Sequence, residues 1–448
     1  MPDNGHRLEF LDYTALRMLR VTGRDQLMQS VWVYERTVDL DGLARFERNL
    51  HRSVGARLIE TSPLPFARPR WVIPDGDPPP LLVGQPRPRE QLLDWADGLG
   101  RLSFDPEHGP GWRLAVQPFT DGTSAVSMIG SHVVGDGTGA LQAVQAAVAG
   151  TMRPVRYDRA GSRPLYRAVP ADLRQVVADA PTTARAAVRA VPLLAKALRG
   201  NRASADPAPA VPSDGSGVVD MPTAAAAVPA ADWDARAAAL SGNSHSLLAA
   251  VAGRLGQALG RYRESDGTVR LQMAVNQRHA TDDDRAIAIG FASASIDPAG
   301  LTTDLTTAST LMGDARRALD GQSDDSWGLL PLVPWLPRSA MRAIPGLLFS
   351  YSESPPVVCS NLGEIAPEIA LIDGAPADHL ILRGLDSQVT HADLARTHGH
   401  LVVVGGRLGD QVSVSVESWQ IGADNSRQRL RDLLDSALAD MGLTGTRY

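Results

Sequence analysis

A stretch without hydrophobic periodicity, Asn201–Ser216, separates the chain into two parts. Its proline, serine, alanine and aspartate content is typical of a linker. Strands and helices are predicted to alternate on both sides of it, which favours an α/β or mixed α+β architecture. We expect a first lobe over residues 1–165, a helical crossover and linker over residues 166–216, and a second lobe over residues 217–448.

The composition is that of a globular protein, with 44% hydrophobic and 21% charged residues. No apolar run approaches the roughly 18 residues that span a bilayer, and no secretory signal is evident at the start, so we expect a cytoplasmic protein. Cys359 is the single cysteine and cannot form an internal disulfide. A net charge of −6 without a basic stripe argues against nucleic acid as a partner.

Hydrophobic periodicity locates the elements of both halves. Helices are predicted at Leu8–Arg20, Asp41–Val54 with Asp41 as its cap, Gln91–Gly98, Thr138–Gly150, Ala171–Arg199, Ala231–Leu240, Ser244–Tyr262, Leu305–Leu319 and Asn425–Met441. Strands are predicted at Val31–Leu40, Arg68–Ile73, Trp112–Pro118, Thr123–Ser131, Gly217–Met221, Val269–Val275, Ile287–Ile296, Val357–Ser360, Leu380–Leu382, Leu401–Val404 and Val412–Val416.

The segment Ser131–Gly137, with the sequence SHVVGDG, carries the clearest candidate chemistry. It follows a predicted strand and precedes a predicted helix. An imidazole titrates near neutral pH, so His132 at a strand end is a candidate general base. Asp136 can fix the loop or orient the ring, and the glycines permit tight turns and close approach of a substrate. A core histidine beside a glycine turn is the alternative interpretation of the same pattern.

The segment resembles the HHxxxDG motif of the chloramphenicol-acetyltransferase-like superfamily of acyltransferases and condensation domains. Five further regions resemble one branch, the bacterial wax ester synthase/diacylglycerol acyltransferase family. In chain order they are Phe10-Leu11-Asp12, Phe104-Asp105 with Pro110–Arg113, Ser244–Gly253, Ala274–Arg278 with Gly290-Phe291, and Ser360–Gly363. The resemblance therefore covers most of the chain.

Several positions depart from the family pattern. Ser131 stands at the first motif histidine, whereas His132 keeps the second, to which the family assigns catalysis. Ser244 and His245 replace an Asn-Asp pair, and Leu362 is followed directly by Gly363 without the family's proline. These changes point to a different substrate or to a site that has lost its activity.

The resemblance implies two lobes, each a mixed sheet with flanking helices, and an active-site tunnel between them. It implies transfer of an acyl group from a thioester to a hydroxyl or amine, with His132 as general base and backbone amides near Gly137 as oxyanion donors. Asp136 is implied to pair with an arginine, for which Arg278 is a candidate. Ser131, Asn361 and Arg278 are the expected substrate-binding residues. No cofactor is expected besides acyl-CoA as co-substrate.

Three functions remain open on this evidence. The first is an acyl-CoA-dependent O-acyltransferase acting on a long-chain alcohol, diacylglycerol or another hydrophobic alcohol. The second is a stand-alone condensation enzyme that takes its acyl group from an acyl carrier protein in natural-product biosynthesis. The third is a degenerate homologue that binds acyl chains without turnover. Lipid substrates would bring the protein to the inner membrane or a lipid droplet, and Ala184–Arg199 is predicted either to lie on such a surface or, preferably, to pack on the crossover.

Other features are assigned structural roles. His391, Asp393, His398 and His400 have ligand types suited to zinc, but a polar loop is the preferred interpretation, so no metal is expected. The glycines at 135, 137 and 139 are interpreted as a tight turn rather than a phosphate cradle. The run Asp282–Arg285 is predicted to be a solvated turn, with donor binding as the alternative, and Cys359 a buried apolar residue.

Overall fold

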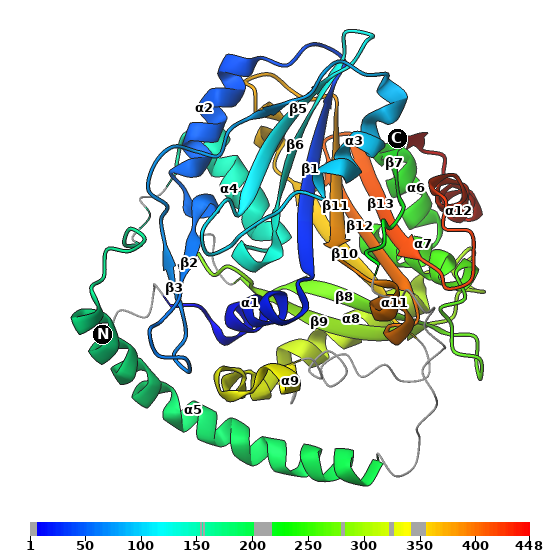
Figure 1. The fold of residues 1–448 in the computed structure, drawn as a ribbon. Helices are drawn as coiled ribbons and strands as arrows, with labels where there is room; N and C mark the ends of the chain where they lie inside the picture. The colour runs from blue at the N-terminus through cyan, green and yellow to red at the C-terminus, as the bar shows by residue number, and fades with distance from the viewer. Residues whose placement is uncertain are drawn as a thin grey trace.

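The computed structural model of the protein describes residues 7–152, 155, 157–200, 217–278, 283–321, 327–341 and 355–448. Two large mixed sheets with helices packed on their faces make up the molecule (Figure 1). This arrangement confirms the expected α/β (α+β) class with mixed sheets and flanking helices. The predicted linker Asn201–Ser216 lies outside the described residues.

The elements follow in chain order. The α-helices are α1 (Phe10–Thr22), α2 (Leu40–His51), α3 (Leu92–Leu99), α4 (Gly137–Ala149), α5 (Leu165–Gly200), α6 (Ala230–Ala239), α7 (Ser244–Ala258), α8 (Thr306–Gly321), α9 (Arg338–Met341), α11 (His391–Arg396) and α12 (Arg427–Asp440). The 3₁₀ turns are η1 (Val54–Ala56), η2 (Arg89–Gln91), η3 (His132–Val134), η4 (Trp327–Trp335) and η5 (Pro367–Leu371). The strands are β1 (Asp25–Tyr34), β2 (Leu58–Glu60), β3 (Arg70–Val72), β4 (Leu82–Val83), β5 (Trp112–Pro118), β6 (Ser124–Ser131), β7 (Thr223–Pro229), β8 (Val269–Asn276), β9 (Ile289–Ile296), β10 (Val357–Ile365), β11 (His379–Ser387), β12 (His400–Leu408), β13 (Gln411–Trp419) and β14 (Thr446–Arg447).

Within the described residues, the first large sheet has five strands in the order β11-β1-β6-β5-β4. Its faces are covered by α2 and α4 on one side and by α3 on the other. Because side chains alternate along a strand, β1 supplies Trp32 to the first of these cores and Val31 to the second. The cap of helix α2 lies two residues before the expected one, since Asp39 rather than Asp41 caps the helix by accepting a hydrogen bond from the backbone N–H of Asp41.

The strand β11 comes from the second half of the chain but belongs to the first sheet. It runs antiparallel to β1 over a continuous register from Asp25–Ser387 to Val33–His379. On its way it touches the second sheet, where the Ser415 hydroxyl of β13 donates to the Leu382 carbonyl at 2.5 Å. Figure 1 shows β11 between β1 and the strands β12 and β13. The expected boundary at residue 217 therefore does not separate the strands of the two sheets.

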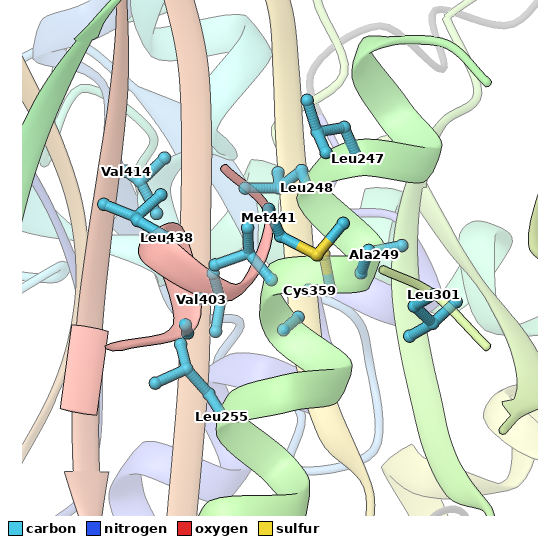
Figure 2. Packing of buried hydrophobic residues seen from close by; sticks show 14 of the residues in the cluster. Leu247, Leu248, Ala249, Leu255, Leu301, Cys359, Val403, Val414, Leu438 and Met441 are labelled. Carbon is cyan, nitrogen blue, oxygen red and sulfur yellow. The ribbon is translucent and has the colours of Figure 1, made fainter. Parts of the chain in front are cut away.

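The described strands of the second large sheet are seven, in the order β14-β7-β13-β12-β10-β8-β9. Helix α7 lies against this sheet with Leu247, Leu248 and Leu255 fully buried. Figure 2 shows Cys359 of β10 among these leucines, which confirms its predicted role as a small buried apolar residue. Burial raises the pKa of the Cys359 thiol to about 12, so a thiolate nucleophile at this position is excluded near neutral pH.

The prediction of a strand at Gly217–Met221 is wrong. The actual strand, β7, follows it at Thr223–Pro229 and contains four consecutive alanines. Alanine favours helices over strands, which hid this element. Pairing with β13 and β14 overrides that preference, and the small side chains suit a strand that is buried on both faces.

The long helix α5 runs along the outside of the molecule (Figure 1). Ala186 is buried, which agrees with the expected packing of the crossover helix. Val188 and Val191, in the segment Ala184–Arg199 that was expected to pack on the crossover, are 74% and 66% exposed. In the ranges that the structure describes, no helix combines the length and apolarity needed to cross a membrane.

Candidate active site

The strand–turn–helix order predicted around His132 is confirmed. Strand β6 ends at Ser131, the turn η3 begins with His132, and helix α4 begins directly after its cap, Asp136. The backbone N–H of Gly135 donates to the His132 carbonyl at 3.3 Å and closes the turn. The sharp change of direction leaves His132 at the end of the strand, where the backbone geometry is fixed on both sides.

Both carboxylate oxygens of Asp136 accept hydrogen bonds. Both of its carboxylate oxygens lie 2.7 Å from Nη1 of Arg278, which confirms the expected arginine partner. Asp136 also accepts from the backbone N–H of Gly139 at 2.8 Å and of Ala288 at 2.7 Å. The side chains of Asp136 and Arg278 are only 1% and 2% exposed. A carboxylate held in this way shapes the loop and has no free oxygen with which to act as a second base.

A short piece of the β8–β9 connection, residues 284–288, is held against the histidine turn, and we call it the clamped segment. Two buried carboxylates accept from its consecutive N–H groups: Asp12 from Ile287 at 3.1 Å, and Asp136 from Ala288. The backbone N–H of Asp136 donates in return to the Ala286 carbonyl at 3.0 Å. Burial raises the pKa of Asp12 to about 7 against the opposing charge of Arg57.

Arg57 ties the clamped segment to the turn from the other side. Its Nε donates to the carbonyl of Val134 at 2.8 Å, and its Nη1 to the carbonyl of Asp284 at 2.7 Å. The guanidinium also lies over the Trp71 ring, 4.8 Å from its centroid. One side chain therefore fixes backbone from both halves of the chain at the histidine turn.

The electrostatic surroundings of His132 favour its neutral form. Burial lowers the pKa of His132, because an imidazolium loses its hydration there. The carboxylates of Asp136 and Asp386 and the backbone carbonyl of His132 itself oppose this effect, but they do not reverse it. A neutral imidazole can accept a proton, so His132 is available as a base at pH 7.

Two glycines of α4 leave room for side chains of the second half. A β-carbon at Gly137 would lie 3.0 Å from Cδ2 of Leu362, and one at Gly139 would lie 2.7 Å from Nη2 of Arg278. The expected tight-turn role is thus correct only in part, because neither residue has a positive φ. Close approach, rather than backbone freedom, requires glycine at these positions.

We expect Gly139→Ala to destabilise the protein by about 1–3 kcal/mol, because the new methyl group overpacks against Arg278 and disturbs its pair with Asp136. Urea unfolding measures the change. Gly98→Ala in helix α3 is the matched control, since a β-carbon there meets no described atom within 4 Å. That control should be neutral or stabilising, and equal losses for both variants would contradict the packing argument.

The remaining expected site residues lie around the same turn. Ser131 is fully buried. Its hydroxyl donates to Asp25 and accepts from the Val133 N–H, so its hydrogen bonds are made to protein groups. Asn361 lies on β10, where its side chain accepts from the Gly363 N–H at 2.8 Å. Its neighbour Leu362 is the residue that packs against Gly137. The structure thus brings the second-half motifs of Arg278 and Asn361 to the histidine turn.

Ser244 and His245 open helix α7, and Asn243 caps it by accepting from the backbone N–H groups of His245 and Ser246. The Ser244 hydroxyl accepts from the indole N–H of Trp233 at 3.0 Å. These contacts stabilise the start of the helix. The Ser244 hydroxyl provides an acceptor for Trp233, a core residue of the second half.

The residues of ligand type at positions 391–400, for which no metal was expected, have separate partners. Asp393 forms a capping box with Thr390 at the start of α11, and His400 pairs with Glu417 at 3.0 Å. No group of three potential ligands gathers in the part of the chain that the structure covers. In the acidic run, Asp282 lies outside the described residues, while Asp283 forms an ion pair with Arg285 at 2.6 Å.

Arg57 and Asp25 also shape this site but were not among the residues predicted for it. Arg57 follows a short 3₁₀ turn and Asp25 begins a strand, and no motif or spacing connects either residue with His132. For Asp25 the one available signal was a charged residue beside a strongly apolar strand. Asp12 belongs to the family-like segment Phe10-Leu11-Asp12, but its contact with residue 287 had no sequence signal.

Comparison of the amino-acid sequence with protein families and with curated proteins gives no match. The structure, in contrast, resembles several solved ones. The first condensation domain of the CDA synthetase aligns with a TM-score of 0.57 and 13% identity, covering 98% of this chain and 99% of that chain. The wax ester synthase/diacylglycerol acyltransferase from Marinobacter aquaeolei VT8 aligns with a TM-score of 0.55 and 16% identity, covering 97% and 98%.

This chain has the condensation-domain fold. A further match is to the nonribosomal peptide synthetase FmoA3, with a TM-score of 0.54 and 16% identity, where the fold covers 99% of this chain but 43% of that larger one. At these identities the likeness establishes the condensation-domain fold and its two-lobe arrangement of mixed sheets.

Proposed function

We propose that this protein is an acyltransferase that moves an acyl group from an acyl-CoA thioester to a hydroxyl acceptor, with His132 as the general base. The acceptor would be a long-chain alcohol, diacylglycerol or another hydrophobic alcohol. The observation that carries the proposal is the histidine turn itself. It holds a half-buried imidazole whose pKa is lowered, and Arg278 pairs with Asp136 and holds that carboxylate away from the imidazole.

The proposed reaction needs no covalent enzyme intermediate. His132 removes the proton of the acceptor hydroxyl as its oxygen attacks the thioester carbonyl. The carbon–sulfur bond then breaks, and the imidazolium returns the proton to the leaving thiolate. Backbone N–H groups near Gly137 are the proposed donors to the oxyanion, and positioning of the two substrates supplies much of the remaining rate. Asn361, beside Leu362, remains a proposed substrate contact.

A carrier-protein donor is the second candidate. It is supported by the likeness to condensation domains of peptide synthetases, which is as good as the likeness to wax ester synthase. The chemistry at His132 would be the same, since both donors present a thioester. Only the group that delivers the thioester would differ.

A donor panel tests the proposal. The purified protein is given radiolabelled palmitoyl-CoA or palmitoyl-loaded acyl carrier protein, each with long-chain alcohols, diacylglycerol and a primary amine. Ester formed from the CoA donor supports the proposal, whereas product from the carrier protein alone supports the second candidate. Binding of acyl-CoA without any product would identify a non-catalytic acyl-binding protein. Adding vesicles of anionic lipid tests whether lipid acceptors are met at a membrane surface.

The pH dependence of kcat/KM should show an acid limb below pH 6.5, the ordinary pKa of histidine. Because burial lowers the pKa of His132, the neutral base persists as the pH falls through 6.5 and is lost only at lower pH. The measurement is the initial rate with limiting acceptor and saturating donor from pH 5 to 8, which gives kcat/KM for the acceptor. An acid limb above 6.5 would contradict the assignment.

Two other carboxyl groups titrate near this range and need control variants. Burial raises the pKa values of Asp12 and Asp25 to about 7. The variants Asp12→Asn and Asp25→Asn should therefore leave the limb below pH 6.5 in place.

A further inference from the structure

A hydrogen-bonded chain runs from the start of β1 to the turn that carries His132. The Ser131 hydroxyl donates to Oδ1 of Asp25 at 2.8 Å and accepts from the backbone N–H of Val133 at 3.2 Å. A hydroxyl has a single proton to donate. Because Asp25 takes that proton, the lone pairs of Ser131 remain for the Val133 N–H, which has no partner within the short turn.

Hydrogen bonds hold the backbone on both sides of the candidate base, His132. Ser131 caps the N-terminal side of η3, while the Gly135 N–H holds the His132 carbonyl on the other side. His132 is the residue between Ser131 and Val133, so its backbone dihedral angles depend directly on this cap. A shift of the turn would move the imidazole, and misplacement by 1 Å can cost about 10²-fold in rate.

Asp25 is an energetically unfavourable partner for the Ser131 cap, because its carboxyl group is buried. The residue is 7% exposed, and among the described residues its Oδ2 has no hydrogen-bond partner. Burial and the neighbouring Asp386 raise its pKa to about 7, because a carboxylate loses its hydration there. A backbone carbonyl would accept from Ser131 without this desolvation cost. Stability alone therefore gives no reason for a carboxyl group here.

We propose that Asp25 is a positioning residue that acts through Ser131 to hold His132 in its reactive orientation. The inference rests on the proposed function of His132. In this chain Ser131 occupies the place of the first motif histidine, and the short serine side chain reaches the turn and β1 at once. The pair would replace whatever support that histidine gives elsewhere, with the carboxylate fixing the direction of the serine hydroxyl.

Ser127 provides a matched control on the same strand. Like Ser131 it lies on β6 and is fully buried, and its hydroxyl accepts from Nε2 of Gln29 at 2.9 Å. It lies four residues before Ser131, which is two periods of the strand's alternation, so both side chains are on the same face of the sheet. Loss of either hydroxyl should cost similar stability, but only Ser131 supports the turn.

The kinetic test compares four variants with the wild type. We expect Ser131→Ala and Asp25→Ala to lower kcat by about 10- to 100-fold with little change in KM, because substrate binding does not depend on the imidazole orientation. Asp25→Asn should recover most of the activity, since its amide oxygen still accepts from Ser131. Ser127→Ala should keep the wild-type kcat. Equal losses for Ser127→Ala and Ser131→Ala, or no loss for Ser131→Ala, would overturn the inference.

A second readout is independent of turnover. In protein labelled with ¹³C-histidine, the ring resonance of His132, assigned with His132→Gln, should be single in the wild type and in Ser127→Ala. It should broaden or split in Ser131→Ala and Asp25→Ala. An unchanged resonance in these two variants would refute the positioning role. If the wild type transfers no acyl group to any acceptor, the proposed function fails, and the resonance alone decides whether Asp25 orders the turn.

Discussion

Replacing His132 with alanine should lower acyl transfer by about 10²–10⁴-fold, which is the usual contribution of a positioned general base. The residual rate would come from holding the two substrates together and from the oxyanion donors. The fold should be unaffected, because burial disfavours the charged form of this imidazole rather than making it a source of stability. The measurement is product formation from labelled acyl-CoA under single-turnover conditions.

His108 is the control for that experiment. It is an exposed histidine that pairs with Asp105 at 2.9 Å. His108→Ala should retain full activity. If His132→Ala also formed ester at the wild-type rate, the general-base assignment would be wrong even though the fold is that of a condensation domain.

The second large effect concerns the stability of the buried pair between Asp136 and Arg278. Arg278→Met should cost about 3–5 kcal/mol of unfolding free energy, because it leaves the buried Asp136 carboxylate without its counter-charge. The variant also removes the donors to the carbonyls of Arg285 and Ala286, so the clamped segment loses contacts with the histidine turn. Urea denaturation followed by circular dichroism measures the loss.

Two comparisons isolate the buried charge as the cause. Arg101 and Asp220 form an exposed pair whose side chains are 64% and 70% accessible, so Arg101→Met should change stability by about 0–1 kcal/mol. The double variant Asp136→Asn with Arg278→Met should regain part of the loss, because the uncompensated charge is gone and asparagine still caps α4. A loss no greater for Arg278→Met than for Arg101→Met would show that the pair is not buried in solution.

The surroundings of His132 divide into parts that local sequence specifies and parts that it does not. The strands predicted at Trp112–Pro118 and Thr123–Ser131 match β5 and β6 almost to the residue. The glycine-rich loop and the following apolar helix predicted the change of direction after His132. These signals lie between residues close in the chain, where backbone geometry and turn chemistry act directly.

Contacts between distant residues had no such signal. Arg278 was a candidate for Asp136 only through a family resemblance, while Asp12 and Arg57 reach the clamped segment across more than two hundred residues. The alanine-rich β7 was missed because its intrinsic preference opposes the pairing that it adopts. The position of β11 in the first sheet had no local signal either, because it depends on which edge of β1 is left unpaired by β6.

The sequence by itself determined the α/β class, the strand–turn–helix unit around His132 and the identity of the candidate base. Only the tertiary structure decided that Asp136 is locked by Arg278, that Ser131 joins Asp25 to the histidine turn, and that β11 links the two sheets. The physical reason is that hydrophobic period and turn chemistry are properties of neighbouring residues. The partners of a buried charge are set instead by how the sheets pack, since a buried carboxylate must take whichever donors the topology brings to it.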